Sequence, residues 1–243
     1  MRSLIGCLLL TLGAPTLAAE PVLIAYRDKP PYTWTDHGKP AGQLLDKTTA
    51  IFARAGVPLR FEEMPSKRIA MELLNNSGPV CSPGWYKLTE RESVANFTRP
   101  IYRDPPQVVL ASTAAAAKIR AHRSVKSLLN DRTLRLAVVD EISYGPELDA
   151  IIKHIPHKPL GATVTALQLS KMVAAERADY MLIDQDDLDY LRASNDFGGV
   201  EPIHFADMPR GLFRYLWCSK QVDAATLNRI DNAISQLGYD GNR

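Results

Sequence analysis

The sequence lacks long apolar runs beyond its N-terminal segment, so it offers no later stretch of the ~20 residues that a membrane-spanning helix requires. An excess of charge of one sign is also lacking, because 29 Lys and Arg residues stand against 27 Asp and Glu residues. The formal net charge of +2 gives no support for binding to nucleic acid or to a lipid surface. We therefore expect a soluble globular protein that binds neither.

Motifs of several enzyme classes are missing as well. The sequence contains no G-x-S-x-G, G-x-x-x-x-G-K, G-x-G-x-x-G or C-x-x-C, which removes support for a nucleophile elbow, a phosphate loop, a dinucleotide site and a dithiol site. His154 and His157 lie three residues apart, but Pro156 separates them and no acidic or cysteine residue is near in sequence. We therefore predict neither a metal site nor a cofactor.

The N-terminus has the order of residues that is typical of a secretory signal peptide. Arg2 is followed by an apolar stretch from Leu4 to Leu17 and then by the small residues Ala18 and Ala19. A membrane anchor is the alternative, but the stretch is shorter than a bilayer span requires. We predict a cleavable signal peptide over residues 1–19 and a periplasmic location.

Cysteine is rare, and this rarity narrows the possible disulfides. Cys7 lies in the predicted signal peptide, which leaves Cys81 and Cys218 in the exported chain. In an oxidising compartment these two can form one internal disulfide. Two free buried thiols on adjacent strands are the alternative.

Short apolar runs alternate with segments of helical periodicity, which predicts an α/β fold. The expected strands cover residues 22–26, 59–62, 79–82, 107–112, 134–139, 180–183 and 213–218, and the expected helices cover 45–52, 68–74, 145–154, 167–176 and 224–237. The first βαβαβ run implies a parallel sheet with right-handed crossovers. If Cys218 pairs with Cys81, the C-terminal segment returns to the first unit. This arrangement predicts two lobes. The first consists of residues 20–104 and 206–243, the second of residues 105–205, and hinges near 102–106 and 203–207 join them.

The most informative segment runs from Thr89 to Tyr102 and reads TERESVANFTRPIY. It resembles the type II periplasmic solute-binding proteins of the polar amino-acid family (bacterial extracellular solute-binding protein family 3), in which T-x-E-R precedes F-S/T-x-P-x-Y. Further similar segments, in the right order, are Pro31-Tyr32 with Gly38 and Gly42, Asp46, Ile142-Ser143-Tyr144-Gly145, and Ala178 to Asp184. The resemblance implies a two-lobed fold with a mixed sheet in each lobe. It also implies a protein that closes on a small ligand and delivers it to an ABC-type permease in the inner membrane. We expect a monomer, because closure requires both lobes to move freely.

Two charged residues are the main binding candidates. The guanidinium of Arg91 can hold a carboxylate by two parallel hydrogen bonds, although an exposed ion pair with Glu90 or Glu92 is the alternative. Asp184 ends an apolar run and can receive a ligand ammonium, although an exposed acidic turn is the alternative. A ligand that bridges these two residues would favour the closed state.

The remaining binding candidates are Ser143, Tyr144, Tyr32, Trp85, Ser82 and Arg68. Ser143 stands where a loop enters a helix and serves either a ligand anion or the helix as a cap. The aromatic residues can stack on a ligand or pack beneath the loops. Lys29 and Ser66 stand where the family often has stacking aromatic residues, so the pocket is expected to be more basic, and a dicarboxylate or other anion competes with an amino acid.

Three other functions are compatible with the sequence. The resemblance extends to periplasmic cyclohexadienyl dehydratases, for which Asp184 is the one carboxylate that we place in the cleft as a general acid. A sensor would use the same ligand pocket, and an interaction protein would leave it empty. We expect a binding protein and not an enzyme.

Overall fold

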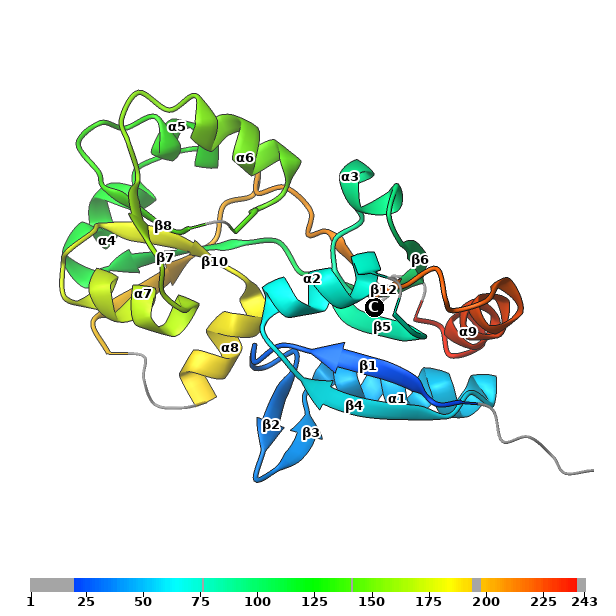
Figure 1. Cartoon of the computed structure of the whole chain (residues 1–243). Coiled ribbons are helices and arrows are strands. Elements are labelled where there is room, and N and C mark those ends of the chain that lie inside the picture. The colour runs from blue at the N-terminus through cyan, green and yellow to red at the C-terminus, as the bar shows by residue number, and fades with distance from the viewer. Residues whose placement is uncertain (1–19, 76, 141, 194–197, 240–243) are drawn as a thin grey trace, which may run out of the picture.

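The protein is described here by a computed structural model that covers residues 20–75, 77–140, 142–193 and 198–239. The predicted signal peptide, residues 1–19, lies outside these ranges. No helix within them is long and apolar enough to cross a membrane. The chain folds into two lobes that lie side by side, each built on a five-stranded sheet (Figure 1).

The first sheet has the strand order β4-β1-β5-β12-β6. Its strands are β1 (Val22–Tyr26), β4 (Leu59–Glu63), β5 (Val80–Trp85), β6 (Asn96–Arg103) and β12 (Phe213–Cys218). The first three are parallel, as the βαβαβ pattern predicts, whereas β12 runs antiparallel to both β5 and β6. The sheet is therefore mixed, because a strand from the far end of the chain inserts into it.

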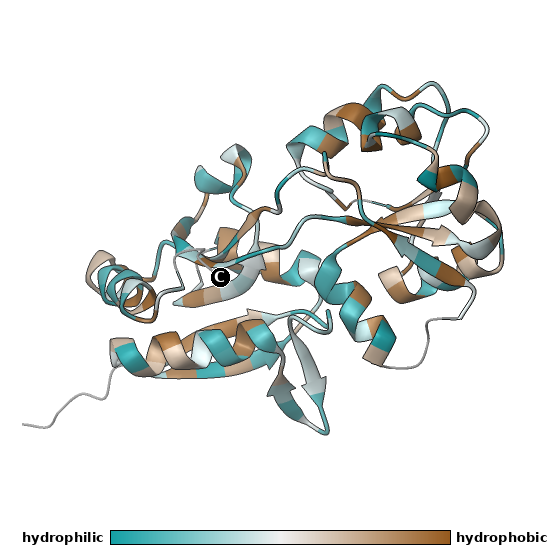
Figure 2. Cartoon of the chain, turned by 180° about the vertical axis from the view of Figure 1, so that it is seen from behind, coloured by the Kyte–Doolittle hydropathy of each residue, from teal (hydrophilic) through white to brown (hydrophobic). Residues whose placement is uncertain are grey.

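Helices cover both faces of this first sheet, namely α1 (Gln43–Ala55), α2 (Ser66–Asn75) and α9 (Ala224–Gln236). The five residues of β1 are all buried, and successive side chains point to opposite faces. Ile24 packs with α1 and α9, whereas Leu23 packs with Ile69 and Leu73 of α2. Hydrophilic and hydrophobic residues accordingly alternate along the helices (Figure 2), as expected of helices with one apolar face.

The second sheet has the strand order β11-β7-β10-β8-β9. Its strands are β7 (Val108–Ser112), β8 (Leu136–Val139), β9 (Leu160–Ala162), β10 (Tyr180–Ile183) and β11 (Val200–Ile203). The helices of this lobe are α4 (Thr113–Arg120), α5 (Val125–Leu129), α6 (Pro146–Lys153), α7 (Ala166–Ala174) and α8 (Gln185–Ala193). Apolar residues of α4, α5 and α6 share one core, and those of α7 and α8 share another. This sheet is mixed too, because β7 runs antiparallel to β10 and β11.

Two crossings connect the lobes, at residues 104–107 between β6 and β7 and at residues 204–212 between β11 and β12 (Figure 1). The second crossing extends further than the hinge predicted at 203–207. The lobe limits predicted from the sequence, 20–104 with 206–243 and 105–205, stay a prediction. The arrangement of two mixed sheets confirms the predicted two-lobed α/β fold.

The disulfide prediction is confirmed. Cys81 of β5 and Cys218 of β12 are directly opposite each other on neighbouring antiparallel strands, with their sulfur atoms 2.03 Å apart and both residues fully buried. The bond joins positions 137 residues apart. It ties the returning strand to the first lobe, and the alternative of two free thiols is wrong.

Several elements are not predicted from the sequence. They are the hairpin of β2 (Trp34–Asp36) and β3 (Lys39–Ala41), the helix α3 (Thr89–Glu92), and the elements β6, β9, β11, α4, α5 and α8. Most of them are too short for a hydrophobic period to show. The strand expected at 79–82 also extends further, to Trp85, and so brings an aromatic residue and a glycine to the end of the first sheet.

Candidate functional site

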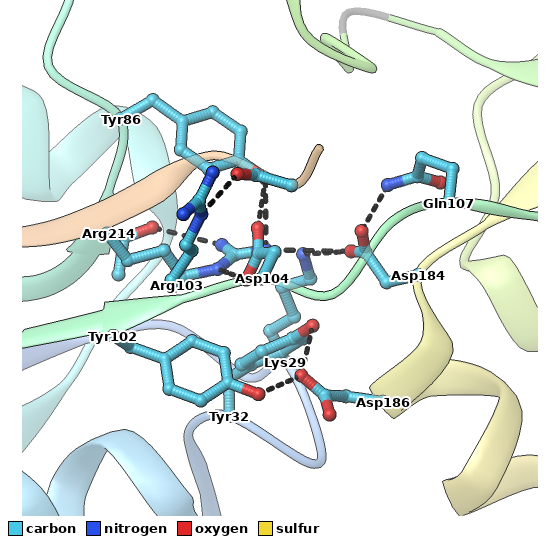
Figure 3. A network of polar contacts seen from close by, with 12 residues as sticks. Lys29, Tyr32, Tyr86, Tyr102, Arg103, Asp104, Gln107, Asp184, Asp186 and Arg214 are labelled. Carbon is cyan, nitrogen blue, oxygen red and sulfur yellow. Dashed lines mark hydrogen bonds and ion pairs between the residues drawn. The ribbon is translucent and has the colours of Figure 1, made fainter. Parts of the chain in front are cut away.

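Polar side chains from both lobes meet where the lobes face each other (Figure 3). We call this group the interlobe cluster, and it consists of Lys29, Tyr32, Tyr86, Tyr102, Asp104, Gln107, Asp184, Asp186 and Arg214. The first lobe supplies residues from the loops after β1 and β5 and from β6 and β12, and the second lobe supplies residues from the end of β10 and the start of α8. Asp104 and Gln107 lie in the first crossing. The cluster is thus assembled from segments that are far apart in the sequence.

Arg214 lies at the centre of the interlobe cluster and is 2% exposed. Its Nε lies 2.6 Å from Oδ1 of Asp104, and Nη2 lies 3.5 Å from Oδ2 of Asp184. Nη1 donates a hydrogen bond of 3.1 Å to the carbonyl of Gly84. Burial alone would lower the pKa of Arg214, but the neighbouring groups together, led by the charge of Asp104, outweigh it, so the pKa is raised and the guanidinium stays charged.

Two aromatic rings surround the same guanidinium. Its Cζ lies 4.3 Å from the ring centroid of Tyr32 and 4.9 Å from that of Tyr86. The Tyr86 hydroxyl also donates a hydrogen bond of 2.6 Å to Asp104. Arg214 therefore combines ionic, hydrogen-bonding and cation–π contacts in one buried position.

Asp184 carries the contacts of the second lobe to the first. It is 9% exposed at the end of β10, which excludes the exposed acidic turn as its environment. Besides Arg214, its carboxylate accepts a hydrogen bond from Gln107 and lies 3.9 Å from Nζ of Lys29. Burial lowers the pKa of Lys29, as does the positive charge of Arg214. Asp184 is therefore surrounded by the protein's own donors.

Asp186, in α8, makes a second set of contacts between the lobes. Its Oδ2 accepts a hydrogen bond of 3.2 Å from the hydroxyl of Tyr32 and another from the hydroxyl of Tyr102. Burial raises the pKa of Tyr32, as does the negative charge of Asp184, so this hydroxyl remains a donor at neutral pH. Opening of the lobes must break these contacts.

Asp187, also in α8, has an unusual pKa. Burial raises the pKa of its carboxyl to about 7. The positive charge of Lys29 lowers this pKa and the negative charge of Asp184 raises it further, but burial is the largest of the three effects. Between pH ~4 and ~7 the folded protein therefore binds one more proton at this residue than the unfolded chain does, and its stability falls as the pH rises through that range. Above pH ~7 both states are ionised and this contribution is constant.

The change Asp187→Asn is expected to raise the free energy of unfolding at pH 8 by about 1–3 kcal/mol and to flatten its decline between pH 5 and 7, because the penalty for ionising the buried carboxyl disappears. Urea unfolding at pH 5 and pH 8 measures the effect. Asp189→Asn, at a position where the side chain is 58% exposed, is the matched control and should change neither value. An unchanged pH profile in Asp187→Asn would contradict the assignment.

Arg91, the predicted anion anchor, lies in α3 and is half-buried. Its Cζ lies 4.9 Å from the ring centroid of Trp85, and Nη1 donates a hydrogen bond of 3.0 Å to the carbonyl of Tyr86. Glu92, which we considered as its ion-pair partner, instead lies 2.9 Å from Nζ of Lys87. Burial lowers the pKa of Arg91.

Trp85 is flanked by a second cation that the sequence analysis missed. Cζ of Arg27 lies 5.1 Å from the ring centroid of Trp85, and burial together with the positive charges of Arg214 and Arg91 lowers the pKa of Arg27 to about 10. Trp85 itself is 9% exposed, and its Nε1 donates a hydrogen bond of 2.8 Å to Oγ of Ser82. Ser82 thus orients the indole ring against which both guanidinium groups lie.

The loop before α6 places Ser143 and Tyr144. Ser143 is exposed, donates a hydrogen bond of 2.5 Å to Asp149 and accepts one from the backbone N–H of Gly145, so it braces the start of the helix. Gly145, and not Ser143, is the N-cap residue of α6. Tyr144 accepts a hydrogen bond of 3.0 Å from the N–H of Val139 and lines a small cavity beside the interlobe cluster.

Arg68 lies apart from this group. It is on the exposed side of α2 and makes ion pairs with Glu72 at 3.6 Å and Glu62 at 3.9 Å. Of the predicted candidates, Tyr32 and Asp184 join the interlobe cluster, while Arg91, Trp85 and Ser82 form a neighbouring group with Arg27.

The central residues Arg214, Asp104 and Gln107 are not among the candidates predicted from the sequence. One signal was available, since Arg214 interrupts the apolar strand FRYLWC, and a charge in a buried strand requires a partner. The identity of that partner is not visible in the sequence.

Known proteins share both the sequence pattern and the fold. Residues 22–243 match the family model of bacterial extracellular solute-binding proteins, family 3. No curated protein has a significant match. Among solved structures, an ancestral arginine-binding protein bound to arginine is 17% identical, with a TM-score of 0.66 and coverage of 90% of this chain and 95% of that one.

Two further structures resemble the chain to a similar degree. The arginine-, lysine-, histidine-binding protein ArtJ from Geobacillus stearothermophilus is 15% identical, with a TM-score of 0.66 and coverage of 90% of this chain and 92% of that one. A histidine kinase sensor domain with similarity to periplasmic binding proteins is 20% identical, with a TM-score of 0.65 and 90% coverage of both chains. At these identities the structural likeness concerns the fold, whereas the family match covers nearly all of the described residues. The chain belongs to the bacterial extracellular solute-binding proteins, family 3.

Proposed function

We propose that the protein captures a small metabolite with a carboxylate or similar anionic group between its two lobes and delivers it to an ABC-type permease of the inner membrane. It acts as a periplasmic monomer after removal of its signal peptide. The observation that carries the proposal is the interlobe cluster, in which buried polar groups of both lobes meet beside the partly buried guanidinium groups of Arg27 and Arg91. Family membership supports solute binding.

Capture requires the lobes to separate. The cavity between Tyr86, Asp104, Gln107 and Tyr144 leaves about 30 Å³ for the centres of water molecules, which is room for only a few waters. A metabolite of amino-acid size therefore needs the contacts of Asp184 and Asp186 with the first lobe to open. A hinge at the two crossings provides this motion, and contacts of the ligand with both lobes would favour re-closure.

Ligand binding is expected to raise the melting temperature of the mature protein. At ~100 times its dissociation constant a ligand adds about 2.7 kcal/mol to the free energy of unfolding. A thermal-shift screen of amino acids, dicarboxylates, polyamines and aromatic acids measures this, and Arg91→Ala should abolish the shift of the best ligand. Arg60→Ala is the matched control, because this exposed arginine pairs with Glu62 and lies outside the site. A shift that persists in Arg91→Ala would refute the anchoring role.

The enzymatic alternative has one observation in its favour. Because burial raises the pKa of Asp187 to about 7, part of this carboxyl is protonated at neutral pH, as a general acid requires. Incubation with prephenate or arogenate tests it, and formation of the aromatic product that Asp187→Asn abolishes would replace binding by dehydration as the function. A sensor role would require a signalling partner in place of the permease. Identification of the protein that co-purifies from membranes distinguishes transport from sensing.

A further inference from the structure

The cleft contains a complete set of acceptors for a cation, and a residue of the protein fills it. The acceptors are the Asp104 carboxylate, the Asp184 carboxylate and the carbonyl of Gly84, with the rings of Tyr32 and Tyr86 on either side. Carboxylates, a carbonyl and aromatic faces are the groups that would hold the ammonium or guanidinium of a ligand. The guanidinium of Arg214 already occupies this place.

Both oxygens of Asp184 also face other donors of the protein. Gln107 donates to one of its oxygens, and Lys29 lies 3.9 Å from the other, the same oxygen that faces Arg214. The second lobe therefore has no unpaired charge at Asp184 with which to attract an amino group. A ligand ammonium that entered here would meet the positive charges of Lys29 and Arg214.

The charges around Trp85, in contrast to that of Asp184, have no ion-pair partner in the part of the chain that the structure describes. Arg27 and Arg91 both lie against its ring, and within the described residues neither guanidinium has a carboxylate at ion-pair distance. Arg27 is also close enough to Arg91 and Arg214 for their charges to lower its pKa. The negative charges nearest to them, those of Asp187 and Glu90, act only from a greater distance. Two guanidinium groups that are partly removed from water and have no carboxylate at ion-pair distance form a receptor for an anion.

We propose that the ligand is a small carboxylate without an α-amino group, held by Arg27 together with Arg91, while Arg214 permanently fills the cation site of the cleft. The inference rests on the proposed function and narrows its ligand class. Arg27 is a specificity-determining residue in this scheme, because a second guanidinium favours the two charges of a dicarboxylate over a single carboxylate.

Calorimetric titration of the mature protein with pairs of acids that differ only by the amino group tests the inference. Suitable pairs are glutarate and glutamate, succinate and aspartate, and 3-phenylpropionate and phenylalanine. In the pair that binds, the acid without the amino group is expected to bind at least tenfold more tightly. Affinities within threefold of each other, or tighter binding of the amino acid, would overturn the inference and leave the proposed function intact. No binding of any member would overturn both.

Variants of Arg27 test the anchor separately. Arg27→Gln should weaken the best ligand at least tenfold, Arg27→Lys should weaken it less, and Arg60→Gln should leave its affinity unchanged. Thermal unfolding of each variant without ligand establishes that it is folded before the titration. If both Arg27 variants are folded and bind as tightly as the parent protein, Arg27 has no role in the anion site and the inference is wrong.

Discussion

Replacement of Arg214 by methionine is expected to lower the free energy of unfolding by about 3–5 kcal/mol, which is the usual cost of removing one partner from a buried ion pair. Arg214 and Asp104 are 2% and 3% exposed, so the carboxylate left behind is largely shielded from the water that would replace the lost guanidinium. The rings of Tyr32 and Tyr86 lose their contact with the cation as well. Urea unfolding followed by circular dichroism at pH 7 measures the change.

Two further variants separate this explanation from a general effect of arginine removal. Arg120→Met breaks an exposed ion pair with Glu201 and should change the free energy of unfolding by less than about 1 kcal/mol. The double variant Arg214→Met with Asp104→Asn should recover part of the lost free energy of unfolding, because it removes the carboxylate charge that the single variant leaves unpaired. Equal stabilities of the single and double variants would show that the stranded carboxylate is not the cause.

Removal of the disulfide is expected to have an effect of similar size. The double variant Cys81→Ala with Cys218→Ala should lower the free energy of unfolding by roughly 2–5 kcal/mol, because the bond restricts the unfolded chain over a separation of 137 residues. Both residues are fully buried, so alanine also leaves a small cavity. Unfolding curves of the double variant and of the parent protein measure the difference.

Reduction of the parent protein provides the control for that cavity. Denaturation in the presence of a thiol reductant should shift the unfolding midpoint of the parent protein towards that of the double variant and leave the double variant unaffected. A parent protein whose midpoint is insensitive to reductant after complete unfolding and refolding would contradict a structural role of the Cys81–Cys218 bond.

The sequence by itself determined the elements whose signals are local. The run Val22–Tyr26 is apolar at every position and is bounded by Pro21 and Arg27, so it is identified as a buried strand without knowledge of its neighbours. The segment from Thr89 to Tyr102 identified the family, and the family match over residues 22–243 confirms it. The two cysteines left after the signal peptide allowed only one pairing.

Tertiary structure decided which charges meet. Arg214 is 110 residues from Asp104 and 30 from Asp184. The cysteine pair predicts that the C-terminal segment returns to the first lobe, but only the fold shows that β12 inserts between β5 and β6 and brings the three charges together. The role of Arg91 as an anion anchor stays a prediction, and the contact of its guanidinium with the ring of Trp85, beside Arg27, depends on where α3 lies relative to the end of β5. Periodicity reports which face of an element is apolar, because that property is local, whereas the partner of a buried charge depends on the packing of distant segments and so appears only in the folded structure.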